Sequence, residues 1–328
     1  MKSKAEKSQF SKLVSDNGIW VVLVVLIIAI TIVNRNFLTP NNAVALLTGE
    51  SVKGVMTFGV TLAILSKGID LSTGSVAALS AICSAALCQA STAKLWAGLP
   101  TMPAIVGILG GIVIGVIVGF ANGWMVAYLR LHPFIATLGT QLICRALCKL
   151  ITPGPVSKLT PGFRFLGNGK IGPFHMIVIV MIIMFIILAF MLKMTRFGKS
   201  VYAVGGNDQA ARVAGINVEH TLVKVYIWCS FCAALGGVLL AGRSDSADPA
   251  NTGLNYELDA IAAATVGGTS QTGGICRPSG VIAGVLIMGV INNGMVMMGV
   301  NDQMTFIVKG LIIIGSVAFD MRKNAVKK

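Results

Sequence analysis

Three long apolar runs constrain the fold of this chain more than any other feature. IWVVLVVLIIAITIV (19–33), MPAIVGILGGIVIGVIVGFANGWMVAYL (102–129) and FHMIVIVMIIMFIILAFML (174–192) each approach or exceed the ~20 apolar residues that a helix needs to cross the bilayer core. They lack the polar alternation of outer-membrane strands, which excludes a closed barrel. With 55% of its residues hydrophobic and 12% charged, the chain is predicted to be an all-α integral membrane protein.

Further segments are shorter or less apolar but fit the same interpretation. No small-residue cleavage pattern follows the first run, so we expect it to be retained as a span and not removed as a signal peptide. The sequence predicts about ten transmembrane helices in a single domain covering 1–328. The ten ranges are 19–33, 43–66, 74–90, 102–129, 131–151, 174–192, 221–242, 258–275, 280–299 and 304–320.

The distribution of basic residues gives these spans a direction. If the N-terminus lies inside, sixteen of the 26 Lys and Arg residues fall on the inner side, six on the outer side and four within spans. Inner loops are typically enriched in Lys and Arg, so both termini are expected in the cytoplasm. The net charge of +14 then reflects topology and contact with anionic membrane lipid, and nucleic-acid binding is not needed to explain it.

The stretch RFGKSVYAVGGNDQAARVAGINVEHT is mostly polar, and the topology places it in the longest cytoplasmic loop, about 193–220. A short helix is predicted at 207–215. Asn207 or Asp208 suits its N-cap, and Gly215 suits the stop after its last turn. An exposed helix in so apolar a protein indicates a surface with a partner, and a solvated connector is the alternative interpretation.

The tripeptide GKS at 198–200 looks like the end of a phosphate-binding loop. That motif needs a glycine where this chain has Lys193. No other nucleotide-binding or catalytic motif is evident, so the chain is not expected to be an enzyme. If transport is driven by ATP, the ATPase is a separate subunit.

Glycines recur every four residues along the predicted span at 102–129. Such a ridge of small residues lets membrane helices approach closely. Because four residues turn a helix by ~400°, the ridge drifts around the helix by ~40° per step. The span is therefore predicted to be central and to touch more than one neighbour. The ridge consists of Gly107, Gly111, Gly115, Gly119 and Gly123.

Polar groups inside the predicted spans need partners or water. Glu50 and Lys53 are three residues apart on one helical face, which predicts an internal ion pair. Gly-rich breaks are expected at 68–74 and 267–274. A path for a neutral, hydroxyl-rich solute is expected near these breaks and two buried amides, with structural capping and packing as the alternatives. The residues assigned to this path are Asp70, Ser72, Gly268, Thr269, Asn292 and Asn293.

The cysteines and histidines do not indicate a metal or redox site. Seven cysteines include pairs spaced C-x-x-C and C-x-x-x-C inside apolar spans, and the three histidines are scattered. Zinc or redox use would need polar access and a second pair of ligands. We therefore expect the cysteines to be small packing residues and expect no metal site.

Several ordered segments resemble the permease subunits of bacterial ABC sugar importers, in the ribose and galactose/methylgalactoside branch. The resemblance covers nearly the whole chain, and its mixture of features leaves the particular sugar open. The matching segments are GIDLSTGSVAALSA (68–81), PFIATLGT (133–140), TRFGKSVYAVGGNDQAARVAGINV (195–218), YELDAIAAATVGGTSQTGG (256–274) and GVINNGMVMMGV (289–300).

The resemblance implies an ABC importer permease in the bacterial inner membrane, paired with a second permease copy. A cytoplasmic ABC ATPase that uses ATP and Mg would dock beneath it, a periplasmic sugar-binding protein would deliver a monosaccharide, and this chain would bind no cofactor. The family's coupling helix, which sits in a cleft of the ATPase, corresponds to Gly205, Gly206, Asn207, Asp208, Ala210, Ala211, Arg212 and Gly215. The family often has Glu where this chain has Gln209. The alternatives are an ABC permease for a branched-chain amino acid and an ion-coupled secondary transporter.

Overall fold

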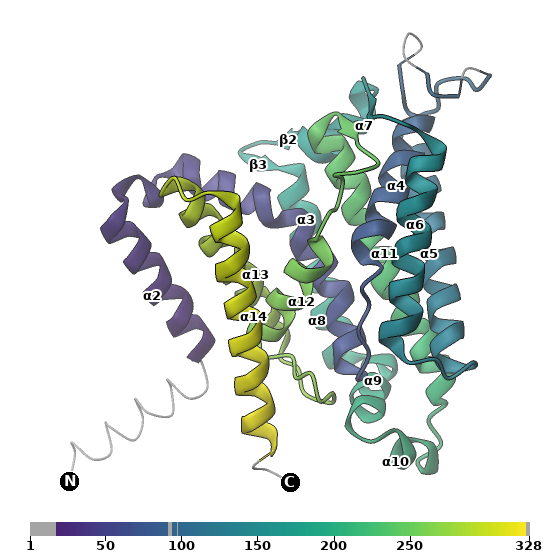
Figure 1. Cartoon of the computed structure of the whole chain (residues 1–328), viewed down its shortest axis with the longest axis vertical. Helices are drawn as coiled ribbons and strands as arrows, with labels where there is room; N and C mark the ends of the chain where they lie inside the picture. The colour runs from purple at the N-terminus through teal and green to yellow at the C-terminus, as the bar shows by residue number, and fades with distance from the viewer. Residues whose placement is uncertain (1–17, 91–93, 97, 326–328) are drawn as a thin grey trace.

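Helices make up most of the fold (Figure 1). The computed structural model describes residues 18–90, 94–96 and 98–325. A helix lies over each range that was predicted to span the membrane. These helices are α2 (Gly18–Val33), α3 (Pro40–Leu65), α4 (Thr73–Leu87), α5 (Ala104–Ala127), α6 (Pro133–Ile151), α8 (Met176–Met194), α11 (Val218–Ser244), α12 (Tyr256–Val266), α13 (Pro278–Met297) and α14 (Asp302–Ala325).

Short elements lie at the two ends of the bundle. The 3-10 helix η1 (Arg35–Leu38) joins α2 to α3, and α7 (Pro161–Asn168) lies between α6 and α8. Two antiparallel ribbons pair β1 (Val156–Ser157) with β4 (Ser246–Ala247) and β2 (Lys170–Ile171) with β3 (Phe174–His175). At the opposite end from α7, α9 (Arg196–Gly206) and α10 (Asp208–Val213) connect α8 to α11 (Figure 1). We call this the α10 end.

Among the described residues, seven helices are long and apolar enough to cross a membrane: α3, α5, α6, α8, α11, α13 and α14. The helices α2, α4 and α12 have 16, 15 and 11 residues, fewer than the ~20 that a complete span needs. The helical membrane fold is therefore confirmed, and the predicted count of ten complete spans is not.

The predicted span at 258–275 is wrong in its second half. α12 ends at Val266, and residues 267–277 form an irregular loop. Gly268, Gly273 and Gly274 have φ angles of +83°, +79° and +73°, a left-handed conformation that glycine adopts at little cost and that ends a helix. The predicted break at 267–274 is thus present as this loop. The break predicted at 68–74 is also present, at residues 66–72, which are not helical and separate α3 from α4.

The glycine ridge of α5 packs as predicted, against two neighbours. All five ridge glycines are buried. A Cβ atom on Gly107 would lie 3.0 Å from the Ser84 carbonyl oxygen of α4, and one on Gly119 would lie 2.6 Å from the Tyr226 carbonyl oxygen of α11. The ridge therefore contacts α4 near the start of α5 and α11 farther along it, which allows backbones to meet without intervening side chains.

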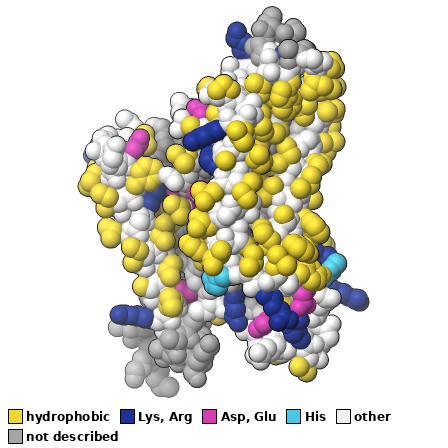
Figure 2. Space-filling view, turned by 45° about the vertical axis from the view of Figure 1, so that its right-hand side comes forward, with side chains coloured by type: hydrophobic (Ala, Val, Ile, Leu, Met, Phe, Trp, Pro, Cys, Tyr) yellow, Lys and Arg dark blue, Asp and Glu magenta, His cyan; other side chains and the backbone are white. Residues whose placement is uncertain are grey.

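The outer surface of the bundle is apolar along most of its height. Figure 2 shows hydrophobic side chains over the flank of the molecule, with one group of Lys, Arg, Asp and Glu side chains at the lower, α10 end and others toward the upper end. Ile117, Leu142 and Leu150 are 62%, 66% and 81% exposed. Because water would penalise so continuous an apolar surface, this flank fits contact with lipid.

Candidate functional site

The polar loop predicted at 193–220 folds into two consecutive helices. The Thr195 hydroxyl accepts a hydrogen bond from the Gly198 amide at 3.0 Å and caps α9. Asn207 caps α10, since its Oδ1 accepts from the Ala210 amide at 3.0 Å. α10 ends before Gly215, whose φ is +81°. The predicted short helix is present, with Asn207 as its N-cap. The preceding helix α9 was not predicted, although its N-cap, Thr195, is a residue type that favours that position.

The residues of this loop that the family resemblance selected point in different directions. Ala211 is 3% exposed and packs with Val204 and Val218. Gly205 is also buried, at the end of α9. In contrast, Val213 is 93% exposed at the end of α10. α10 is therefore held through Ala211 and leaves Val213 open on its other side.

A group of residues in this loop is exposed to solvent. They lie on α10 and its flanks, away from the small core around Ala211. They are Gly206, Asn207, Asp208, Gln209, Ala210, Arg212, Val213, Ala214 and Gly215.

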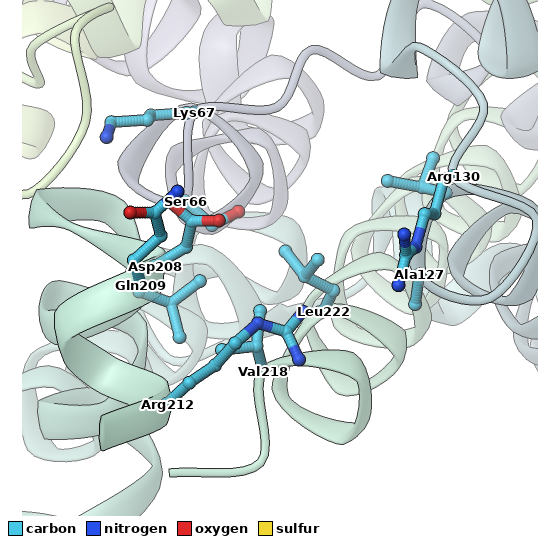
Figure 3. A pocket seen from close by; sticks show the side chains of 11 residues that line it. Ser66, Lys67, Ala127, Arg130, Asp208, Gln209, Arg212, Val218 and Leu222 are labelled. Atoms are coloured by element: carbon cyan, nitrogen blue, oxygen red, sulfur yellow. The ribbon is translucent and has the colours of Figure 1, made fainter. Parts of the chain in front are cut away.

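A cavity of about 680 Å³ lies between α10 and the ends of α3, α5 and α11 (Figure 3). Its lining includes Lys67 after α3, Arg130 after α5 and Arg212 of α10, together with Asp208. Arg212 Nη2 lies 2.6 Å from the Glu219 carboxylate, and this hydrogen bond raises the pKa of the Arg212 guanidinium. The lining therefore presents more positive than negative groups at the α10 end.

Asp70 and Ser72 belong to a buried hydrogen-bonded network. Asp70 Oδ1 accepts from the Ser72 amide at 2.9 Å and from the Ser72 hydroxyl at 2.6 Å. Asn122 Nδ2 of α5 donates to Ser72 Oγ at 2.9 Å, and Thr140 of α6 donates to Asn122 Oδ1 at 2.6 Å. The network ties α4, α5 and α6 together. Ser72 occupies the N-cap position of α4, but its side chain does not cap the helix.

A second polar group lies where α3, α12, α13 and α14 meet. Lys53 Nζ lies 3.4 Å from Glu50 Oε1, which confirms the predicted ion pair. Lys53 also lies 3.0 Å from Asp259 Oδ2, and Lys309 lies 3.0 Å from Asp259 Oδ1. Asp259 and Lys309 were not predicted as partners, although each lies inside a predicted span, where a charged side chain needs a partner or water.

Asn292 extends this charged group, because its Nδ2 donates to Glu50 Oε1 at 3.0 Å. Its Oδ1 is buried and has no hydrogen-bond partner among the described residues. Asn293 makes a separate contact, accepting from Asn42 Nδ2 at 2.9 Å.

Gly268 and Thr269 lie in the loop after α12, where Thr269 is fully buried and contacts Cys276 Sγ at 3.4 Å. The six residues assigned to a path therefore fall into three groups: the network around Asp70, the contacts of α13 with α3, and the loop after α12. None of the hydrogen bonds or ion pairs of these six residues connects one group to another. A role in a path remains a prediction for all six.

The chain matches known transport proteins along its length. The family model for the branched-chain amino acid transport system permease component matches residues 42–317. The galactose/methyl galactoside import permease protein MglC of Escherichia coli (strain K12) is 39% identical, covering 99% of this chain and 100% of the relative. The ribose import permease protein RbsC of Bacillus subtilis (strain 168) is 36% identical, covering 99% and 98%. No solved structure was found to match.

The match to the family model covers more than half of the chain, and the relatives align with it nearly from end to end. The apolar flank and the seven helices able to cross a membrane fit a membrane-embedded transport protein. The chain therefore belongs to the family of transport-system permease components.

Proposed function

We propose that this chain is the permease subunit of an ATP-driven, binding-protein-dependent importer of a monosaccharide, of the galactose/methyl galactoside or ribose type. The observation that carries the proposal is the identity of 36–39% with import permeases of these names over 99% of the chain. Similarity over the full length includes both the membrane helices and the loop that carries α10.

The chain crosses the inner membrane ten times in this proposal, with both termini in the cytoplasm. The α10 end is then the cytoplasmic end, and the excess of Lys and Arg there supports this orientation. Four of these basic residues, Lys67, Arg130, Lys199 and Arg212, are exposed at that end. The basic residues at 2–12 and 327–328, which entered the prediction, lie outside the described residues.

The proposed partner at the cytoplasmic end is an ABC ATPase, which hydrolyses ATP with Mg in its own subunit. α10 is the coupling helix that enters a cleft of this ATPase, and exposed Val213 is its apolar contact. The Arg212–Glu219 pair keeps α10 beside the start of α11. A second copy of the permease completes the path, and a periplasmic sugar-binding protein delivers the sugar at the end opposite α10.

The experiment that tests the proposal is uptake by vesicles that contain the chain, its ATPase and its binding protein. ATP-dependent uptake of galactose, methyl galactoside or ribose is the expected result. The family description makes a branched-chain amino acid the second candidate, and ATP-dependent uptake of leucine without sugar uptake would establish it. Uptake by the chain alone, driven by an ion gradient, would overturn the proposal.

A further inference from the structure

Three backbone segments meet directly behind α10. The Gly274 amide in the loop 267–277 donates to the Leu65 carbonyl oxygen, at the end of α3, at 2.9 Å. A Cβ atom on Gly205, near the end of α9, would collide with the Leu65 carbonyl oxygen and lie 2.7 Å from the Gly274 nitrogen. No side chain separates these segments, so a displacement of α9 is passed to the loop by backbone contact.

Side chains reinforce the contact between α9 and the loop. The Tyr202 hydroxyl of α9 donates to the Cys276 carbonyl oxygen at 2.7 Å. Lys67, which follows α3, donates from Nζ to the Gly206 carbonyl oxygen at 3.2 Å and so ties α9 to the end of α3. Only Asn207 separates α9 from α10, so a movement of α10 also moves α9 and the loop that α9 contacts.

The far side of the loop is attached to α14. Asp320 Oδ2 accepts from the Ser270 hydroxyl at 2.8 Å and from the Gln271 amide at 3.1 Å. None of the α14 side chains whose burial is described is buried. Val308, Ile312 and Ile313 of α14 are partly buried against neighbouring helices, and the polar contacts of Asp320 add to this limited apolar packing.

A second polar contact on α14 lies deeper in the bundle. Lys309 is eleven residues before Asp320, which is about 16 Å along a helix. Its ammonium group lies 3.0 Å from Asp259 Oδ1 of α12, and Asp259 also binds Lys53 of α3. α14 thus connects the loop at the α10 end with the charged group inside the bundle.

We propose that the loop 267–277 transmits movement of α9 and α10 to α14, and that Tyr202 and Asp320 are positioning residues for transport. The proposal rests on the proposed function for the source of movement, an ATPase docked on α10. It adds which membrane helix responds and through which contacts. Coupling between distant sites can be carried by packed segments and hydrogen bonds, and the contacts of the loop 267–277 connect α9 with α14 in this way.

The test uses the complete importer in vesicles, with the permease variants Asp320→Asn and Tyr202→Phe. We expect ATPase attachment to be unchanged and the sugar imported per ATP hydrolysed to fall about fivefold or more, a coupling change of ordinary size. Asp302→Asn is the matched control on α14, because Asp302 is exposed in its first turn. Tyr128→Phe removes the hydroxyl from an exposed tyrosine as the second control.

The double variant tests whether the two residues act through one loop. If they do, the losses in Asp320→Asn with Tyr202→Phe do not multiply, because either change alone interrupts the same connection. An unchanged ratio of sugar to ATP in both single variants would overturn the proposal. An equal loss in the controls would do the same.

Spin labels separate this proposal from the proposed function. Labels on Lys199→Cys in α9 and Leu311→Cys in α14 report the distance between these helices with the ATPase attached, with and without ATP. The unsubstituted chain gives the background from native cysteines. We expect the ATP-dependent change in this distance to be lost in Asp320→Asn. Its persistence would overturn the transmission role, whereas absence of ATP-dependent uptake of any sugar by the unaltered complex would overturn the proposed function itself.

Discussion

Val213 and Ala211 lie two residues apart on α10, yet Val213 is 93% exposed and Ala211 is 3% exposed. The six-residue helix is therefore held by one face and open on the other. This difference determines which substitutions test docking and which only disturb the fold.

Replacing Val213 with Asp should abolish ATPase attachment and ATP-dependent uptake while leaving thermal stability unchanged, because the new carboxylate remains in water until a partner covers it. Co-purification with the ATPase measures attachment. Lys199→Gln, which changes the charge of exposed Lys199 on α9 by the same one unit, should keep attachment. Normal attachment of Val213→Asp would show that α10 is not the docking helix.

Replacing Ala211 with Glu should instead destabilise the protein by about 3 kcal/mol, because it places an unpaired carboxylate among Val204 and Val218. The thermal unfolding temperature in detergent should fall. Loss of uptake in this variant is therefore no test of docking. An unfolding temperature equal to that of the unaltered chain would contradict the buried position of Ala211.

Replacing Gly119 with Ala should destabilise the contact between α5 and α11 by about 1–3 kcal/mol. The added Cβ would lie 2.6 Å from the Tyr226 carbonyl oxygen and 2.8 Å from the Ile227 Cα, and neither backbone atom can move independently. Gly139→Ala in α6 is the control, since its Cβ would meet no atom within 4 Å. Thermal unfolding of both variants in one detergent makes the comparison, and equal unfolding temperatures would contradict the ridge.

Replacing Asp259 with Asn leaves Lys53 and Lys309 without the carboxylate that both contact. We expect a loss of stability of about 3–5 kcal/mol, as for other buried pairs that lose one partner. Adding Lys309→Gln to this variant should restore part of the loss, because one uncompensated charge is removed. If the double variant is less stable than Asp259→Asn alone, the two residues are not coupled in this way.

Replacing Asn292 with Leu tests the predicted path. Its Oδ1 is a buried acceptor without a partner among the described residues, and a sugar hydroxyl would donate to it once the path opens beside α13. We expect the concentration of sugar that gives half-maximal uptake to rise several-fold, with ATPase attachment unchanged. Unchanged sugar kinetics and selectivity in a well-expressed variant would remove Asn292 from the path.

Much of the helical fold could be predicted because its signals are local. Apolar runs marked the helices, the four-residue glycine spacing marked the central position of α5, and Asn207 and Gly215 marked the ends of α10. The error at 258–275 arose because the predicted span was extended across the glycine-rich segment GGTSQTGG, although a break was also predicted at 267–274. The left-handed backbone conformation at Gly268, Gly273 and Gly274 shows that this segment is a loop and that α12 ends before it.

The candidate site was less predictable, because its contacts join distant parts of the chain. The Glu50–Lys53 pair could be found from its spacing on one helix. The Lys53–Asp259 and Lys309–Asp259 pairs depend on how α3, α12 and α14 pack. Likewise, no sequence signal distinguished buried Ala211 from exposed Val213, since both are apolar residues of one short helix.

By itself, the sequence determined that this chain is a helical membrane protein with a capped helix in a long polar loop, because hydropathy and capping depend on neighbouring residues. The tertiary structure decided which face of α10 is open, which charges meet inside the bundle, and that Tyr202 and Asp320 hold opposite sides of one loop. These properties depend on contacts between residues up to hundreds of positions apart, which are set only when the helices pack.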